Sequence, residues 1–253
     1  MSLNSKVALV TGGGRGIGRS IALELAARGA KVVVTGRSTS DLEEVAEQIG
    51  GVAIAMDLND RAQSDQALTQ LQEQVGGVDI LVNNAGIADA APIKRTSLET
   101  WDRIFEVNVT AVFRLCKSLL PHMTEQGWGR IITIASNAGL TGYGYSAPYC
   151  ASKHAVIGFT RAMAVDLGTT GVTINAVCPG WVETDMALAA VERISQSTGR
   201  SAEKARAALE NMSPQRRMIS PEEVASMTAM LCGDGARGIN GQSLVIDGGQ
   251  VLK

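Results

Sequence analysis

Short apolar runs rich in β-branched residues alternate along the chain with longer stretches in which apolar residues recur every three or four positions. The short runs lie at residues 6–11, 31–35, 52–56, 78–83, 130–135, 172–177 and 243–246. Most of them are continuously apolar, which is typical of parallel strands that are covered on both faces. The longer stretches predict helices at 18–28, 41–49, 62–74, 98–125, 148–167 and 221–231.

Repeated alternation of strand and helix predicts an α/β fold, a doubly wound seven-stranded parallel sheet with helices on both faces. No Pro- or Ser-rich linker divides the 253 residues, so we expect a single domain over 1–253. A TIM barrel would need eight regular βα units and a late phosphate site, whereas the glycine-rich loop here comes first. The stretch from Thr184 to Ser220 inserts polar helical sequence after a strand, where such sheets bind ligands. It predicts a substrate loop, and a solvated helical excursion without function is the alternative.

Charge and composition exclude several classes of protein. Lys and Arg number 23 and Asp and Glu number 25, a net charge of -2, which argues against nucleic acid as a partner. The start of the chain lacks a basic segment followed by a long apolar one, and no apolar run reaches about 18 residues, so no membrane is expected as a partner. The four cysteines lie far apart and only two histidines are present, so we expect no metal site. The chain reads as cytoplasmic, with buried cysteines in a reducing compartment.

The 28 glycines are concentrated in particular places, first of all in the sequence TGGGRGIG at 11–18. This segment follows the first predicted strand and opens the first helix, the position of a phosphate-binding loop in a Rossmann fold. Glycine permits close approach of the backbone to a pyrophosphate, and the helix N-terminus presents free N–H groups to it. We therefore predict a dinucleotide site that uses Gly12, Gly14, Arg15, Gly16, Ile17 and Gly18.

The residue after the second strand selects the cofactor. An NAD enzyme usually carries a carboxylate there for the ribose 2′-hydroxyl, but this chain has Arg37. An arginine can bind a 2′-phosphate with two parallel hydrogen bonds, and Arg15 could supply a second positive charge. We therefore predict that NADP(H) is the preferred cofactor and that NAD(H) is possible. The alternative is that both arginines are solvated surface residues that bind no phosphate. Asp57 is placed either to meet the adenine ring or to cap the following helix.

Tyr149 and Lys153 lie four residues apart on the predicted helix at 148–167, so both side chains face the same way. A nearby ammonium group, together with an oxidised nicotinamide, would lower the pKa of the tyrosine and allow proton exchange with a carbonyl oxygen. Ser136 ends a strand at the rim where ligands meet the sheet, so its hydroxyl can bind the same oxygen. The spacing alone is a weak signal, and an amphipathic surface pair is the alternative.

Taken together, these features resemble the short-chain dehydrogenase/reductases of the single-domain type. The resemblance spans the whole chain and rests on TGGGRGIG at 11–18, Asp57-Leu58, NNAG at 83–86, Asn108, Ser136, YCASK at 149–153, PGWVET at 179–184 and the closing INGQSLVIDGG. It implies hydride transfer between a nicotinamide cofactor and a carbonyl or alcohol carbon.

The resemblance also implies a role for each residue of the site. Ser136 would orient and polarise the carbonyl, Tyr149 would be the general acid/base, and Lys153 would lower the Tyr149 pKa and bind the nicotinamide ribose. Asn108 would hold a water linking Lys153 to solvent; the alternative is a mid-helix residue bonded to its own backbone. Further cofactor contacts would come from Asp57 and Leu58, from Asn83, Ala85 and Gly86 on the adenosine side, and from Pro179, Gly180, Val182 and Thr184 at the nicotinamide.

The sequence identifies the substrate less clearly than it identifies the type of reaction. The pattern looks most like ketoreductases acting on β-ketoacyl thioesters and like 3-hydroxybutyrate-type dehydrogenases. Carrier-protein reductases tend to place basic residues where this chain has Gly127 and Thr170, so CoA thioesters and small free ketones stay equally open. An NAD-linked dehydrogenase of a hydroxy acid or sugar alcohol and a non-catalytic NADP-sensing protein are the alternatives.

Aromatic and apolar residues gather in the loops after Ser136 and after the Pro179–Gly180 turn. The predicted substrate contacts are Ser136, Tyr143, Tyr149, Trp181 and Met186; for the loop side chains, core packing or subunit contact is the alternative. A basic cluster of Arg193, Arg200, Lys204 and Arg206 could meet phosphates, with a solvated helix face as the alternative. Related enzymes form tetramers through a pair of long helices, so the resemblance also implies a homotetramer.

Overall fold

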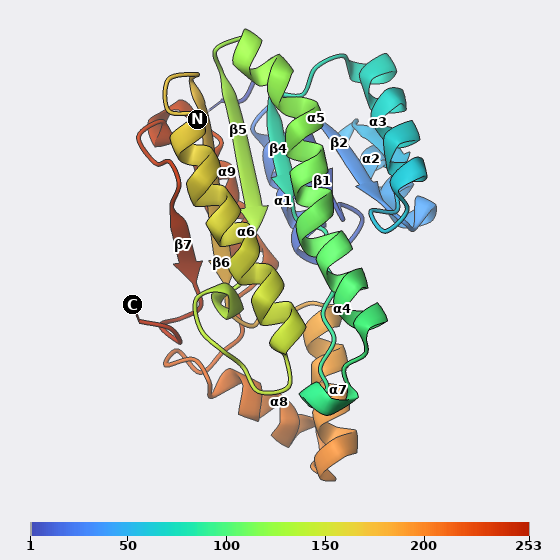
Figure 1. Ribbon diagram of the computed structural model, residues 1–253, viewed down its shortest axis with the longest axis vertical. Coiled ribbons are helices and arrows are strands. Elements are labelled where there is room, and N and C mark those ends of the chain that lie inside the picture. Colours follow the sequence, from blue (N-terminus) through green and yellow to red (C-terminus); the bar gives the residue numbers. More distant parts are fainter. Residues whose placement is uncertain (1, 253) are drawn as a thin grey trace.

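The computed structural model describes residues 2–252, and its centre is a sheet of parallel strands (Figure 1). Within these residues seven strands form one sheet in the order β3-β2-β1-β4-β5-β6-β7, which confirms the predicted Rossmann-type fold. They are β1 (Val7–Thr11), β2 (Lys31–Gly36), β3 (Val52–Ala55), β4 (Ile80–Asn83), β5 (Gly129–Ile134), β6 (Val172–Pro179) and β7 (Ser243–Ile246). The order reverses between β1 and β4, and such a switch point opens a crevice at the carboxyl ends of the strands.

Helices cover both faces of this sheet, and each face has its own apolar core. One core joins the sheet to α1 (Gly16–Ala27), α2 (Thr39–Ile49) and α9 (Pro221–Leu231). The other joins it to α3 (Arg61–Val75), α5 (Ala111–Glu125) and α6 (Ala147–Asp166), of which α5 and α6 lie in front of the sheet in Figure 1. The strands are buried from both sides, as their continuously apolar sequences predict.

The single helix predicted over 98–125 is interrupted in the structure. It consists of α4 (Leu98–Phe105), a π-helical turn over Glu106–Thr110, and α5. Such π turns occur frequently at functional sites, and this one contains the candidate residue Asn108. Short 3₁₀ turns at Ile93–Arg95, Asn137–Gly139 and Asp234–Ala236 complete the connections.

The predicted insertion forms a small helical unit beyond the carboxyl ends of the strands (Figure 1). It contains α7 (Asp185–Thr198) and α8 (Ala202–Glu210), which enclose a core separate from the other two. That core is built from Ala187, Val191, Ala205, Leu209 and Met218, with Trp181, Ala190 and Ile194 packed against it. None of the helices within 2–252 is long and apolar enough to cross a membrane.

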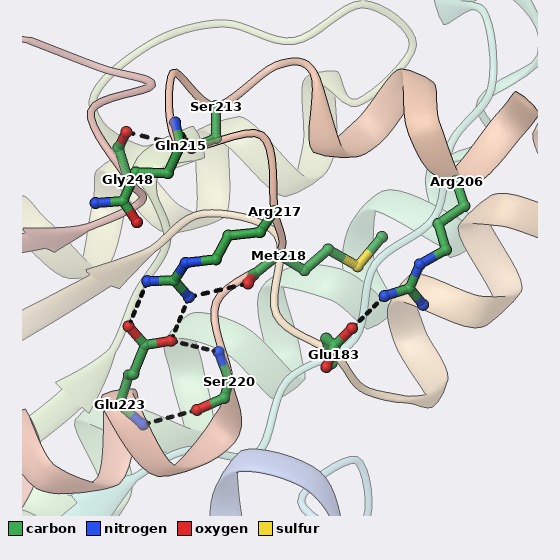
Figure 2. A network of polar contacts seen from close by, with 9 residues as sticks. All are labelled: Glu183, Arg206, Ser213, Gln215, Arg217, Met218, Ser220, Glu223 and Gly248. Carbon is green, nitrogen blue, oxygen red and sulfur yellow. Dashed lines mark hydrogen bonds and ion pairs between the residues drawn. The ribbon is translucent and has the colours of Figure 1, made fainter. Parts of the chain in front are cut away.

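Hydrogen bonds and ion pairs connect the two ends of this insertion to each other and to α9. The Ile219 N–H donates to Trp181 O at 2.8 Å, and the Glu183 N–H donates to Ile219 O at 3.0 Å. Figure 2 shows Arg206 on α8 paired with Glu183, and Arg217 paired with Glu223 by bonds of 2.6 and 2.8 Å. The two ends of the insertion are therefore held together, and its second end is fixed to α9.

Candidate active site

The glycine-rich loop lies in the crevice between β1 and α1. Its Gly13 N–H donates to Thr35 O at 3.0 Å, which holds the loop against the end of β2. A Cβ on Gly18 would overlap the carbonyl oxygen of Gly12, so the first turn of α1 packs on the loop as only a glycine permits. Gly12 and Gly16 adopt positive φ angles of 63° and 52°. The bare backbone at the helix N-terminus has the form of a phosphate cradle.

Asn84 fixes this loop to the end of β4. Its Nδ2 donates to Thr11 O at 2.8 Å and to Gly12 O at 3.2 Å, while the Thr11 Oγ1 accepts from the Asn84 and Ala85 N–H groups at 3.0 Å each. Sequence reasoning left Asn84 out of the site although it lies inside the NNAG motif. The side chain of its neighbour Asn83 points the other way, donating to the Cys116 Sγ in the core at 3.7 Å.

Three predicted residues meet beside this motif. A Cβ on Gly86 would lie 3.4 Å from Asn108 Oδ1 and 3.6 Å from Lys153 Nζ. Asn108 itself binds both backbone groups of Ile87 at 2.9 Å and donates to Ser152 Oγ at 3.0 Å. The alternative that Asn108 bonds its own helix backbone is therefore wrong.

Lys153 is buried, with 5% of its surface exposed. Its Nζ donates to the carbonyl oxygen of Ile134 at 2.8 Å, and burial lowers the pKa of the ammonium group to about 8. The alternative of an amphipathic surface pair is excluded, because a lysine at a surface position would keep its ammonium group in water.

Tyr149 lies on α6, one turn before Lys153. The Lys153 Nζ is 5.6 Å from the centre of the tyrosine ring, and the Ser136 Oγ accepts from the Ala138 N–H at 3.1 Å. Burial raises the pKa of Tyr149 to about 12, and the influence of the Ser136 side chain, which lowers that pKa, does not cancel the rise. The direction is opposite to the expected lowering by Lys153, because desolvation of the phenolate outweighs the other effects in this environment.

The loop that carries Ser136 is fastened to the C-terminal segment. The Asn137 Nδ2 donates to the buried carboxylate of Asp247 at 3.2 Å, and the Gln250 Nε2 donates to the Tyr143 hydroxyl at 2.8 Å. Asp247 and Gln250 come from the end of the chain, and sequence reasoning did not connect them with the site. Tyr143 is half-buried and thus lies against the C-terminal segment.

Several predicted contacts have side chains directed into cores. Leu58 belongs to the core on the α5 side of the sheet, Val182 to the core on the α1 side, and Trp181 packs on the core of the insertion. Leu58 and Val182 can therefore contact a ligand only through their backbone atoms. For Trp181, core packing, the alternative to a substrate contact, is what the structure has. The Asp57 carboxylate accepts from the Asn59 N–H at 2.9 Å in a local turn, whereas Asp60 caps the next helix.

The two arginines of the predicted phosphate site are Arg37, just after β2, and Arg15, within the glycine-rich loop. Arg37 is exposed and makes no hydrogen bond or ion pair within residues 2–252. Arg15, at the N-cap of α1, lies 3.3 Å from the carboxylate of Asp185 on α7. Thr184 touches the same loop, because a Cβ on Gly16 would lie 3.2 Å from its Cγ2. Met186, the next predicted contact, is half-exposed at the mouth of the insertion.

The residues present fit a dinucleotide. The cradle is bare backbone that side chains would fill, and Arg37 follows the end of β2, the strand whose Thr35 carbonyl holds the loop. Ser136 follows the carboxyl end of β5, and Tyr149 and Lys153 lie in the first two turns of α6. The arrangement can bind a carbonyl oxygen through two hydroxyls and pass it one proton.

Comparison with known proteins identifies relatives over the full length of the chain. The family model described as short chain dehydrogenase matches residues 6–194. A D-beta-hydroxybutyrate dehydrogenase of Cupriavidus necator is 38% identical over 257 residues, covering 99% of this chain and 100% of that protein. A 3-oxoacyl-acyl-carrier-protein reductase of Vibrio cholerae is 40% identical over 254 residues, covering 100% of both. A crystal structure of an actinorhodin polyketide ketoreductase variant with NADPH has a TM-score of 0.94 and 39% identity, covering 99% of each chain.

Proposed function

The chain belongs to the short-chain dehydrogenase family, and on this premise we propose that it reduces a ketone to a secondary alcohol with NADP(H) as the preferred cofactor. The proposed substrate is a 3-oxoacyl thioester carried by CoA or by an acyl carrier. The observation that supports this proposal most strongly is the buried ammonium group of Lys153, which lies 5.6 Å from the centre of the Tyr149 ring one turn earlier on α6.

The chemistry divides between the cofactor and the chain. The reduced nicotinamide, when bound, supplies a hydride to the carbonyl carbon and becomes oxidised. Ser136 and Tyr149 hold the carbonyl oxygen by their hydroxyls, and Tyr149 gives its proton to that oxygen as the C–O π bond is converted to an alcohol. The high pKa of Tyr149 keeps this proton in place until the oxygen gains charge. Asn108 positions the helix that carries Tyr149 through its bond to Ser152.

The cofactor is assigned to the crevice between the glycine-rich loop and Thr184. The loop from Gly12 to Gly18 would hold the pyrophosphate, Ala85 and Gly86 the adenosine side, and Lys153 the nicotinamide ribose. Arg37 and Arg15 favour NADP(H), since each can pair with a 2′-phosphate. The NADPH in the related actinorhodin ketoreductase structure supports this assignment.

The substrate is proposed to enter between Met186 and the loop that carries Tyr143. Gly127 and Gly171 meet beside Thr170, where neither turn carries a basic residue and the Arg130 guanidinium that binds the Gly171 carbonyl is buried. A CoA thioester is therefore as well supported as an acyl carrier protein, although the relative from Vibrio cholerae is described as a carrier-protein reductase. The insertion at 184–220 is proposed as the substrate loop of a single domain.

Purified protein with NADPH and acetoacetyl-CoA tests the proposal directly. We expect loss of nicotinamide absorbance that depends on the thioester and is slowed by about 10²–10⁴-fold in Tyr149→Phe. An unchanged rate in Tyr149→Phe would contradict the proposed role of Tyr149 as the proton donor. A panel that adds an acetoacetyl carrier protein and free ketones then ranks the substrates.

A second candidate is NAD-linked oxidation of a small hydroxy acid, favoured by the likeness to the Cupriavidus necator dehydrogenase. The same side chains would then act in reverse, with Tyr149 accepting the proton of the alcohol. Titration of wild type and Arg37→Asp with NADH and NADPH separates the two. Tighter NADPH binding that Arg37→Asp reverses supports the reductase.

The protein is also proposed to be a homotetramer. Phe113 on α5 and Val165 on α6 are exposed, 49% and 81% respectively, on the helices that cover one face of the sheet (Figure 1). Exposed apolar side chains on such a face suit an isologous contact with a second copy. Sedimentation of wild type against Phe113→Glu tests this, with a smaller species expected for the variant.

A further inference from the structure

An ion pair joins the glycine-rich loop to the insertion. Arg15 caps α1 and donates to the Asp185 Oδ2 at 3.3 Å, and Asp185 is the first residue of α7. The neighbouring residues also touch, since the methyl group of Thr184 lies over Gly16. The two segments thus meet at consecutive residues although they lie far apart in sequence.

The pair is not buried, so its partners can be exchanged. The side chains of Arg15 and Asp185 are 69% and 70% exposed. A cavity of about 430 Å³ opens between the two segments, and its wall contains Glu183, just before the insertion, and Leu188 within it. An arginine in such a place can turn from one anion to another at little cost, because exposed ion pairs contribute only about 0.2–1 kcal/mol.

We propose that Asp185 is a specificity-determining residue for the cofactor, because it competes with the 2′-phosphate of NADP(H) for Arg15. The inference rests on the proposed function, in which Arg15 and Arg37 bind that phosphate. Binding of NADP(H) then exchanges the carboxylate of Asp185 for the phosphate and detaches the start of α7 from the loop. NAD(H) has a hydroxyl in place of the phosphate and leaves the ion pair intact.

Charge decides the direction of the exchange. A phosphate carries more negative charge than a carboxylate and accepts two parallel hydrogen bonds from a guanidinium group. It therefore takes Arg15 from Asp185, while the lost ion pair reduces the net affinity. Arg37, which has no such competitor within residues 2–252, binds the phosphate in either case.

A double-mutant cycle measured by cofactor binding tests the proposal. Dissociation constants for NADPH and NADH are obtained by nicotinamide fluorescence for wild type, Asp185→Asn, Arg15→Gln and the double variant. We expect Asp185→Asn to tighten NADPH binding about two- to fivefold, the size of an exposed ion pair, and to leave NADH unchanged. In the Arg15→Gln background the same substitution is expected to change neither.

Glu192→Gln is the matched control, because Glu192 lies on the same helix about 10 Å further along its axis. This control removes the same charge and should leave both dissociation constants as in wild type. An equal gain for NADH, a gain that persists without Arg15, or a gain in Glu192→Gln would overturn the proposal. So would no gain in Asp185→Asn.

The cycle also separates this inference from the proposed function. Failure of Arg15→Gln and Arg37→Asp to weaken NADPH binding contradicts the proposed cofactor preference itself. Weaker NADPH binding in those variants, with Asp185→Asn equal to wild type, contradicts only the competition by Asp185.

Discussion

Asn108 binds the main chain of Ile87 through both atoms of its side-chain amide. Its Oδ1 accepts from the Ile87 N–H and its Nδ2 donates to the Ile87 carbonyl, each at 2.9 Å. A second bond from Nδ2 reaches Ser152 on α6 at 3.0 Å. The π turn that contains Asn108 thereby connects the loop after β4 to the helix that carries Tyr149 and Lys153.

Asn108→Ala is expected to weaken both stability and catalysis. The substitution leaves the backbone groups of Ile87 without a partner in a partly buried place, which costs about 1–3 kcal/mol in free energy of unfolding. The catalytic rate falls as well, because Ser152 loses its hydrogen bond to the π turn. Denaturant unfolding and steady-state rates measure the two effects. Asn211→Ala, at an exposed position, serves as the control, and full activity in Asn108→Ala would contradict the positioning role.

Tyr149→Phe is expected to lower kcat by about 10²–10⁴-fold, the usual contribution of a positioned proton donor. The ring remains, so affinity for NADPH should stay as in wild type. Ser136→Ala removes a hydroxyl that binds the same oxygen and should lower kcat less, since the proton donor is retained. Stopped-flow measurement of single turnovers isolates the chemical step.

The matched control for the tyrosine variant is Tyr145→Phe, because the Tyr145 side chain is 69% exposed. It should react at the wild-type rate. A loss of cofactor binding in Tyr149→Phe equal to its loss of rate would show that the hydroxyl positions the nicotinamide instead of transferring a proton.

The sheet and most helix positions could be predicted from sequence because burial on both faces leaves continuous apolar runs in strands. The π turn could not, since a helix over 98–125 has the same apolar spacing with or without it. The extra residue of the π turn rotates the Asn108 side chain toward Ile87. The hydrogen bond between them therefore depends on a loop that lies 21 residues earlier in the chain.

Side-chain direction was the second feature that sequence could not supply. NNAG places Asn83 and Asn84 side by side, yet Asn83 faces Cys116 in the core and only Asn84 reaches the glycine-rich loop. Contacts between distant segments were equally hidden. Asn137 binds Asp247, which is 110 residues away in sequence, and Arg15 binds Asp185, which is 170 residues away. No local sequence pattern predicts either pairing.

The pH dependence of the reduction should follow Lys153. Burial lowers its pKa to about 8, so the ammonium form prevails below pH 8 and is lost above it. Tyr149, with its pKa raised to about 12, stays protonated across that range. We therefore expect kcat/KM of the free enzyme to be level below pH 8 and to fall above it. Lys153→Arg, which keeps its charge, should remove the decline, and a decline that persists in this variant would assign it to another group.

Leu209→Ala is expected to loosen the insertion while the sheet stays intact. Leu209 is buried in the core of α7 and α8, which is separate from the two cores of the sheet, so the cavity left by the substitution costs about 2–5 kcal/mol locally. Amide exchange should therefore accelerate within residues 185–210 and stay slow in the strands, and KM for the oxo substrate should rise more than kcat falls. Met212→Ala removes an exposed apolar side chain from the same insertion and should change neither quantity. Uniform acceleration of exchange across the sheet would show that the insertion unfolds together with the rest of the protein, and an unchanged KM would remove its role at the substrate.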